Sequence, residues 1–468
     1  MTKPLRLELD RSARTPLADQ IHNGIRAAIE TGVLAPGARL PSWQDLAAQL
    51  GVARGTVRSA YEKLSSAQLI VAARATGTHV AERLSFPARQ DKAPDPGSFM
   101  EMYRELTAGP AFFQMGVPGQ ATLPATLLAR MRAQAVRVEM SAPAIYPDPR
   151  GEPDLRREIA AYLALARGIA CAPSQIIITG GFSGGLGLAL RTLGLEQKKV
   201  WMEDPGFPFT RHGLELAQLS VVPIPVDADG IDVTYGLQHA ADAALAVVTP
   251  GQQAPLGSTL LLERRARLLD WAAQGKAWVI EDDYLSELQL KGRATPALAS
   301  LDRAGRVIHI GSFSKTVTPT LRLGFVVAPT ALASRFAEAA ACLAPAPGPA
   351  VQLAMADFIR EGHYLRHLRR TKRTYAAQAD TLLKLLRART DNVALAGLAA
   401  VLRLPNGTSD LSIARDAASF GLAPTPLSLW YASKAKARPG LLLGVATSPQ
   451  KRLEASCERL FAIIERHA

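Results

Sequence analysis

The sequence is poor in cysteine and has no apolar stretch long enough to cross a membrane. Its three cysteines, Cys171, Cys342 and Cys457, lie far apart and match no metal-ligand spacing. The most apolar candidate, residues 331–356, is interrupted by charged residues and three prolines. We therefore predict no metal site and no membrane helix, and we expect free thiols in a reducing cytoplasm.

The N-terminus also lacks the apolar core of a secretory signal, because Lys3, Arg6, Glu8 and Asp10 lie among its first ten residues. The apolar fraction of 48% and the charged fraction of 20% are typical of a folded globular protein. A chain of 468 residues exceeds one ordinary core, so we expect two or more domains.

The net charge of +13 favours polyanionic partners, but it does not identify one. Residues 1–83 carry 11 basic and 7 acidic side chains, which is too small a surplus to indicate nucleic-acid binding without a motif.

Three regions follow one another along the chain. Residues 1–83 have the pattern of short helices followed by a strand pair. Residues 84–110 are rich in proline, glycine and charge, and we interpret them as a linker. From residue 111 to 468, apolar runs alternate with helical segments, which predicts an α/β domain.

Helix start signals are clear in the first region. Thr15 is a good N-cap with Pro16 at the first helical position, and the apolar residues from Leu17 to Ile29 share one face. Ser42 caps a second predicted helix, and Gly51 makes the tight turn before a third. The second and third helices cover residues 43–50 and 54–66.

This spacing predicts a helix-turn-helix, in which the second helix of the pair presents its first residues to the major groove. Arginine can pair with guanine, and serine or threonine can contact phosphates or base edges. A strand pair with a turn at residues 75–77 would form a wing. The candidate DNA-contacting residues are Ser42, Arg54, Thr56, Arg58, Ser59, Arg74 and Thr78. The alternative is a three-helix packing module that binds nothing.

Seven apolar runs in the third region are strand candidates, and several are continuous enough to be covered on both faces. A helix is predicted over residues 260–274, with Ser258 and Thr259 as caps and Gly275 at its end. The strand candidates are residues 175–179, 199–203, 220–226, 244–249, 277–281, 307–311 and 323–328.

Polar residues and glycines follow five of these strands, and ligands bind at the carboxyl ends of strands in open α/β sheets. Lys315 can bind an aldehyde cofactor covalently when it is partly desolvated. Asp282 can keep a pyridine nitrogen protonated, and Tyr284 can donate to the ring hydroxyl.

A phosphate would fit the turn Gly181, Phe182 and Ser183, which opens a helix. Ser312 and Arg322 flank Lys315, and Phe207 offers a ring for stacking. Each residue has a structural alternative: surface charge, loop cap or core aromatic. Together they predict a pyridoxal 5′-phosphate site.

Residues 17–80 resemble the GntR family of winged-helix regulators. The segments PGARLPS, LAAQLGVARGTVRSAYEKL and GTHV carry the resemblance, in that order. Two positions depart from the pattern. Gln44 replaces an arginine that usually follows the LPS turn, and Ala53 replaces the usual serine or threonine cap.

The third region resembles a class I, fold-type-I aminotransferase, as fused to GntR domains in MocR-type regulators. The segments YPDPRGEPDLRREI, EDPGFPFTR, EDDYLSELQLKGR and HIGSFSKTVTPTLRLGFVVAP carry the resemblance. It implies a mainly parallel seven-stranded sheet in a large part, about residues 146–334, and a small α+β part, about residues 335–468. It also implies the cofactor roles given above and a head-to-tail homodimer.

Several substrate-facing positions depart from working aminotransferases. Leu441 stands where those enzymes hold the substrate carboxylate with arginine, and Ala254 replaces an asparagine. Gln252 and Ala399 fall where many relatives have histidine, and the phosphate turn carries Gly180, Gly184 and Gly185. These departures favour a sensor of a small amine, an amino acid or a B6 vitamer over an active aminotransferase with an accessory DNA-binding domain. A cofactor-free scaffold conflicts with the residues that remain.

Two features stay open. Arg211 could contact an anion or have a structural role. The basic run Arg366, Arg369, Arg370, Lys372 and Arg373 is either a solvated helix face or an extension of the DNA-contacting surface.

Overall fold

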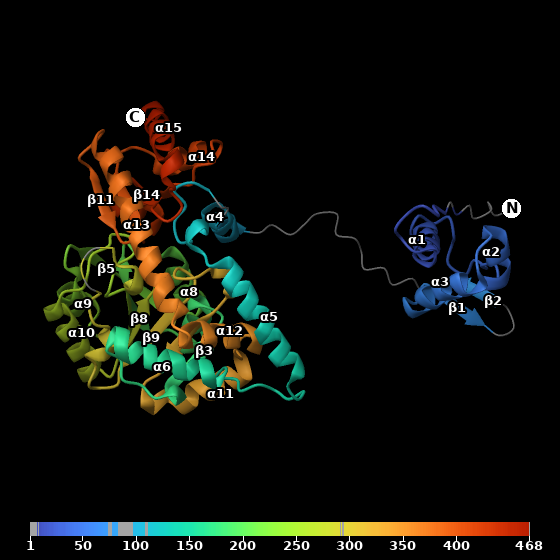
Figure 1. The fold of residues 1–468 in the computed structure, drawn as a ribbon, viewed down its shortest axis with the longest axis horizontal. Helices are drawn as coiled ribbons and strands as arrows, with labels where there is room; N and C mark the ends of the chain where they lie inside the picture. The colour runs from blue at the N-terminus through green and yellow to red at the C-terminus, as the bar shows by residue number, and fades with distance from the viewer. Residues whose placement is uncertain are drawn as a thin grey trace. The chain divides into compact units, whose positions relative to one another are not determined.

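The computed structural model describes residues 7, 9–73, 77–82, 97–107, 111–290, 292 and 294–467. The chain forms two compact units, Met1–Gly97 and Ser98–Ala468 (Figure 1). Within the described residues, no helix is long and apolar enough to cross a membrane.

The first unit packs three helices against a β-hairpin, as predicted for a winged helix-turn-helix. The elements are α1 (Leu17–Glu30), α2 (Trp43–Leu50), α3 (Arg54–Ser66), β1 (Ile70–Ala73) and β2 (Gly77–Val80). Ile21, Ile25, Val57 and Leu64 are fully buried in its core.

Helix starts in this unit agree with the sequence at α2 and differ at α1. The Ser42 hydroxyl accepts a hydrogen bond from the Asp45 N–H (3.1 Å), as a cap should. At α1 the prediction was one residue early: Pro16 is itself the N-cap, in an extended conformation, and no side chain caps the helix. Thr15 therefore lies outside the helix and does not cap it.

The second unit is built on an eight-stranded sheet, where the sequence predicted seven strands. Its order is β3-β10-β9-β8-β7-β4-β5-β6. The ladders between β9, β8, β7, β4 and β5 are parallel, and β10 runs antiparallel to both of its neighbours. The strands are β3 (Ile176–Thr179), β4 (Lys199–Asp204), β5 (Ser220–Asp227), β6 (Gly230–Ile231), β7 (Leu245–Val248), β8 (Trp278–Asp283), β9 (Val307–Ser312) and β10 (Gly324–Val327). The eighth strand, β6, has two residues and is too short to give an apolar pattern.

Helices cover both faces of this sheet, and consecutive strand residues enter different cores. Ile176 and Ile178 belong to one apolar core, whereas Ile177 belongs to another. The helices are α5 (Ala125–Ser141), α6 (Pro153–Arg167), α7 (Phe182–Leu193), α8 (Pro208–Leu216), α9 (Val233–Ala240), α10 (Leu262–Gln274), α11 (Ala333–Leu343) and α12 (Pro349–Arg360).

Helix α10 ends at Gly275 as predicted but begins two residues late. Leu261 is its N-cap and makes no side-chain cap bond. The predicted capping role of Ser258 and Thr259 was wrong, because both precede the cap and the Thr259 hydroxyl donates to the Gly251 carbonyl (3.2 Å).

A smaller α+β part follows the large one. Helix α13 (His363–Arg387) runs from the large part towards it (Figure 1). Its antiparallel sheet has the order β11-β12-β14-β13. The elements are β11 (Val393–Ala396), β12 (Ala399–Arg403), α14 (Asp410–Ala418), β13 (Thr425–Pro426), β14 (Gly440–Gly444) and α15 (Leu453–Arg466).

The stretch that we interpreted as a linker contains a helix, α4 (Gly97–Thr107). The Phe99 ring stacks on His212 of α8 with the centroids 4.0 Å apart, and Tyr103 lies 5.1 Å from Phe209. Residues 98–107 therefore belong to the second unit. The residues that form these aromatic contacts are distant in sequence, so the local composition of residues 84–110 does not indicate them.

The cap at α2 predicts a local loss of stability. Ser42→Ala should weaken α2 by about 1 kcal/mol, because the Asp45 N–H loses its partner. Faster amide hydrogen exchange at the start of α2 would report this loss. Thr15→Ala is the matched control and should leave exchange in α1 unchanged; equal effects of both changes would contradict the assignment of the caps.

Candidate functional site

The first unit presents the beginning of α3 to solvent. Arg54 and Arg58 are exposed, and Thr56 and Ser59 are half-buried beside them. Arg58 also pairs with Glu62 one turn later (3.0 Å), an exposed contact that contributes little to stability. The predicted recognition surface is therefore displayed by this helix.

The other predicted DNA-contacting residues differ in their situation. The Ser42 hydroxyl is engaged by Asp45, to whose carboxylate it donates (2.7 Å). Thr78 is half-buried in β2, and Arg74 lies outside the described residues. Arg39, which is not among the predicted DNA-contacting residues, is exposed and lies against the wing: a Cβ on Gly77 would be 3.4 Å from its Nε.

In the second unit, Lys315 follows β9 and its ammonium group donates to the Gly116 carbonyl. Gly116 has a φ of +76°, and a Cβ there would be 3.1 Å from Nζ, so the close approach favours glycine. Burial lowers the pKa of Lys315, and the Asp282 carboxylate only partly opposes this. A larger fraction of the amine is neutral near pH 7, which suits a nucleophile.

Asp282 lies at the carboxyl end of β8, in the same part of the sheet. Burial, and then the charges of Asp283 and Glu203, raise its pKa well above 3.8. A carboxyl in this setting ionises readily only when a cation is placed against it. Burial followed by the Asp282 and Glu203 charges also raises the pKa of Tyr284, so its hydroxyl stays protonated and can donate.

The residue next to Asp282 serves the scaffold. Asp283 is buried and accepts a hydrogen bond from Arg167 Nε (2.7 Å). His309 lies 3.0 Å from Glu281; burial alone would lower its pKa, but Glu281 and Asp283 outweigh burial and raise it. Alternation along β8 thus separates Asp282 from a buried ionic network that fixes its strand.

A second group of residues meets where β3 gives way to α7. Gly181 is the N-cap of α7 with a φ of +83°, and a Cβ there would be 3.9 Å from Ser314 Oγ and 4.0 Å from Arg322 Nη1. Phe182 and Ser183 begin the helix. The helix N-terminus, the hydroxyls and the guanidinium form a donor set that suits a phosphate.

Ser312 is a predicted phosphate-contacting residue here, whereas Ser314 was not predicted. The Ser312 hydroxyl donates to Ser314 Oγ (3.0 Å) and accepts from the Ser314 N–H (3.1 Å). Ser312 therefore orients Ser314, which is the hydroxyl beside Gly181. The sequence does contain this second hydroxyl, in the segment Ser-Phe-Ser-Lys that ends at Lys315.

Phe207 precedes α8 and packs against a buried apolar cluster that comes mainly from the small part. Its ring centroid is 5.5 Å from that of Trp430. We call the buried members of this group the apolar roof; Phe207 and Tyr284 pack against it. The apolar roof consists of Ala254, Ala396, Val401, Leu427, Trp430 and Leu442.

Leu441 and its neighbour Leu442 belong to different core clusters. Leu441 was expected at the carboxylate-binding position, but it packs into the main core of the unit. Leu442 belongs to the roof near Phe207, because neighbouring residues of β14 point to opposite faces. Both leucines are apolar and fully buried, and Ala254 lies in the same roof as Leu442.

The remaining candidates are structural. Arg211 donates to the carbonyls of Leu429 (3.1 Å) and Trp430 (3.3 Å), which favours its structural role over an anion contact. Gln252 donates to the Leu285 carbonyl (3.0 Å), and Ala399 is buried in β12.

Glu203, in β4, was also missed. Its carboxylate accepts from Thr249 N (2.9 Å), Thr249 Oγ1 (2.6 Å) and Gln253 Nε2 (3.3 Å), and the side chain is buried. Burial raises the pKa of Glu203 to about 7. Glu203 is a second buried carboxyl whose charge affects Asp282. In the sequence, only its position at the end of a predicted strand, before Asp204-Pro205, could have indicated it.

Glu203→Gln should change how stability depends on pH. The folded-state pKa of about 7 exceeds the ordinary 4.5, so the native protein holds an extra proton between these values and loses stability as pH rises through them. The glutamine variant lacks this loss, and its free energy of unfolding relative to wild type should rise by about 3 kcal/mol across that window. Denaturant unfolding of the second unit, followed by tryptophan fluorescence, measures it. A pH-independent difference would contradict the assignment.

Two families match the chain. The family described as bacterial regulatory proteins, gntR family, matches residues 17–80, and aminotransferase class I and II matches residues 114–416. The probable rhizopine catabolism regulatory protein MocR of Rhizobium meliloti is 33% identical over 97% of this chain and 95% of its own length. The pyridoxine biosynthesis transcriptional regulator PdxR of Corynebacterium glutamicum is 32% identical over 97% of both.

Solved structures resemble the second unit in fold. An archaeal alanine:glyoxylate aminotransferase superposes with a TM-score of 0.71 at 22% identity, over 79% of this chain and 95% of that chain. A kynurenine aminotransferase of Pyrococcus horikoshii gives 0.71 at 21% identity, over 82% and 97%. With a GntR winged helix before an aminotransferase fold and regulators as relatives along nearly its whole length, the chain belongs to the MocR subfamily of GntR-type transcription regulators.

Proposed function

We propose that this transcription regulator binds pyridoxal 5′-phosphate at Lys315 and uses that site to sense a small amine, an amino acid or a B6 vitamer. The observation that carries the proposal is a contrast within one site. The groups suited to hold the cofactor converge, whereas Ala254 and Leu442, in the cluster against which Phe207 and Tyr284 pack, offer no side-chain donor to a substrate carboxylate.

The described residues fit this cofactor at both of its ends. Ser314, Arg322 and the start of α7 would hold the phosphate, with the positive φ of Gly181 leaving room for it. Asp282 would face the pyridine nitrogen, Tyr284 the ring hydroxyl and Phe207 the ring face. When bound, pyridoxal phosphate supplies an aldehyde that reacts with amines and an electron-withdrawing ring. Lys315 supplies the amine that anchors it.

The apolar roof argues against ordinary amino-acid turnover. A carboxylate placed against Leu442 and Ala254 would lose its hydration without gaining the paired donors that an arginine supplies. We infer that the chain's own residues bind and orient a ligand here and exclude water from it.

We further propose a cytoplasmic homodimer in which α3 of each chain contacts operator DNA. An exposed apolar surface near the end of α5 supports self-association: Met140 is 73% exposed, Ile145 78% and Tyr146 100%. Such a patch on one chain suits the same patch on another. The head-to-tail arrangement remains an inference from the family.

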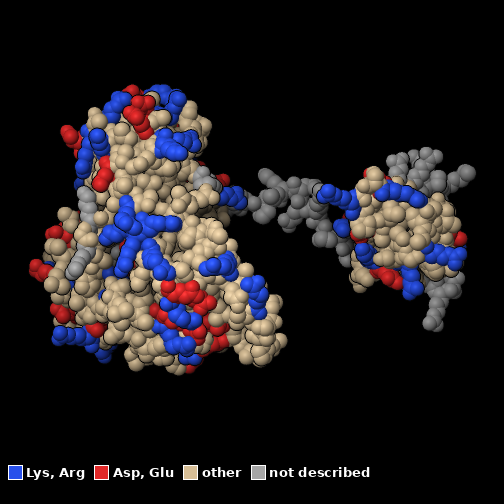
Figure 2. Space-filling view, in the orientation of Figure 1, with Lys and Arg blue, Asp and Glu red and all other residues tan. Residues whose placement is uncertain are grey.

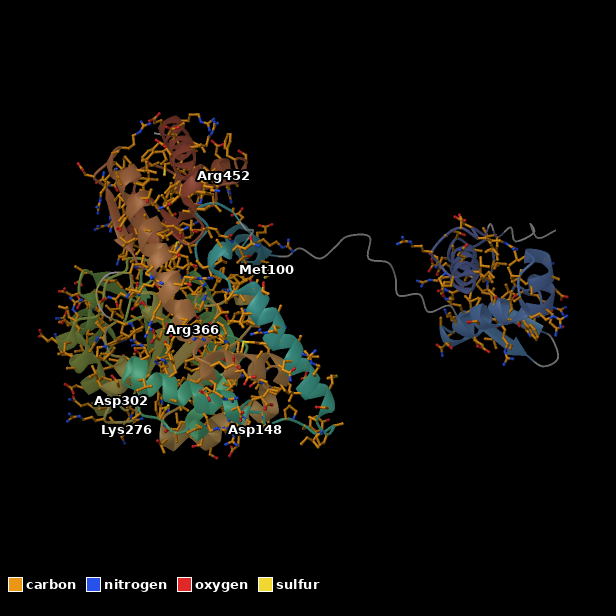
Figure 3. The ribbon with its side chains drawn as sticks, viewed as in Figure 1. Met100, Asp148, Lys276, Asp302, Arg366 and Arg452 are labelled. Atoms are coloured by element: carbon orange, nitrogen blue, oxygen red, sulfur yellow. The ribbon has the colours of Figure 1, made fainter. Side chains whose placement is uncertain are left out.

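Lys315→Ala tests the cofactor. Wild-type protein incubated with pyridoxal phosphate should gain visible absorbance. Borohydride reduction should then leave a pyridoxyl group attached permanently to residue 315. The variant should show neither. Lys276→Ala is the matched control, since this exposed lysine lies beyond α10 in a turn (Figure 3). A colourless wild-type protein that borohydride does not label at Lys315 would exclude the proposal.

Arg54→Ala tests the recognition helix. Loss of a side chain that pairs with a base should weaken operator binding by about 1–3 kcal/mol, or roughly fivefold to 150-fold. Gel-shift titration measures this, and circular dichroism checks the fold. Arg26→Ala, on the exposed face of α1, should keep wild-type affinity. Equal affinities of all three proteins would contradict the assignment of α3.

A further inference from the structure

Helix α13 carries a stripe of arginines on its exposed side. Arg366, Arg369, Arg370 and Arg373 follow a spacing of three, four and seven residues, which places them on one face, and all four are exposed. We call these four residues the arginine stripe. Figure 2 shows basic side chains gathered over α13, and Figure 3 labels Arg366 near the start of this helix.

The arginine stripe differs from Arg360, at the end of the preceding helix α12. Arg360 pairs with Asp154 (2.9 Å), Glu158 (3.1 Å) and Asp357 (2.8 Å). In the part of the chain that the structure describes, the four stripe arginines and Lys372 make no ion pair. Helix α13 holds seven basic residues and one acidic residue, Asp380. Like charges one turn apart repel each other, so this stripe lowers helix stability unless an anion covers it.

The backbone beneath the stripe is held firmly. Tyr364, His367, Leu368 and Thr371, on the opposite side of α13, are buried, and Arg370 Nη2 donates to the Thr122 carbonyl (2.6 Å). From Arg366 to Arg373 the helix rises about 10 Å. One DNA strand carries a phosphate about every 3.4 Å along its axis, so this length matches about three phosphates.

We propose that the arginine stripe binds the phosphate backbone of DNA outside the sequence read by the winged helix. Arginine suits phosphate because its planar donors form paired hydrogen bonds and its charge is permanent. The inference rests on the DNA-binding role of the regulator and adds a contact that reads charge, not sequence. An acidic protein surface or a second copy of the chain is the other occupant that the test must separate from DNA.

The full-length variant Arg369→Gln/Arg373→Gln tests the stripe. Neither side chain makes a hydrogen bond or ion pair to another described residue, so the fold should be preserved. Lys451→Gln/Arg452→Gln is matched in charge and exposure on a different element, as Figure 3 shows for Arg452. Fluorescence anisotropy gives Kd against salt for a minimal operator and for the same operator with flanking DNA.

With flanking DNA, the stripe variant should reduce the slope of log K against log salt by about 1 to 2 and weaken binding by about tenfold. The minimal operator should show no change, and the control variant should behave as wild type. An unchanged slope, an equal loss on the minimal operator, or an equal loss in the control would overturn the proposal. A changed oligomeric state on size exclusion would assign the stripe to a contact between copies and would also overturn it.

Arg54→Ala separates this inference from the recognition helix. If the stripe binds flanking DNA, Arg54→Ala should lose preference for the operator sequence and keep the stripe-dependent part of the salt slope. If Arg54→Ala kept full operator preference while the stripe variant lost slope, the recognition helix would be misplaced and the stripe would still stand.

Discussion

Desolvation at the carboxyl edge of the eight-stranded sheet determines the direction in which the pKa values of the candidate site residues shift. It lowers the pKa of Lys315 and raises the pKa values of Asp282 and Tyr284, so each group moves towards its neutral form. The shift at Lys315 favours the neutral amine, and the shifts at Asp282 and Tyr284 favour the protonated carboxyl and phenol. The sheet creates this state because its parallel strands end together under a covering of apolar side chains.

The same desolvation requires compensation nearby. Arg167 holds Asp283, and His309 lies between Glu281 and Asp283, so the charges behind the site are paired. Buried ion pairs of this kind contribute more to geometry than to stability. Removing one partner leaves the other charge buried and unpaired. We infer that this network fixes the end of β8, on which the orientation of Asp282 depends.

Most of the fold was predictable because its signals are local. Continuous apolar runs gave all seven long strands, and the helical spacing gave the winged helix. The two-residue β6 and the helix α4 were missed, since one is too short to show a pattern and the other is stabilised by contacts with α8. The placement of Leu441 and Leu442 in different clusters has a similar origin. Register along β14 depends on its neighbours β12 and β13, which a single strand does not reveal.

The sequence suggests candidate site residues where a residue type is itself chemically specific. Lys315 and Asp282 were named from their positions after predicted strands and Arg322 from its position near Lys315, whereas the contacts of Glu203 and Ser314 required the structure. Glu203 matters through its hydrogen bonds to Thr249 and Gln253, and Ser314 through its place beside Gly181. Both are tertiary relations between residues distant in sequence.

Helix α13 has a second face with a consequence of its own. His367 Nε2 donates to the carbonyl of Thr316 (2.6 Å), and the Tyr364 hydroxyl donates to Thr316 Oγ1 (3.2 Å). Thr316 is the residue directly after Lys315, so one rigid helix contacts the lysine loop on its inner side and carries the arginine stripe on its outer side. Thermodynamic linkage makes any coupling through such a helix reciprocal. If occupancy of the lysine site changes affinity on the outer face by some factor, occupancy of the outer face changes affinity at the lysine by the same factor. Helix α13 would then couple binding at its two faces in both directions. The DNA would act as an effector of the small-molecule site.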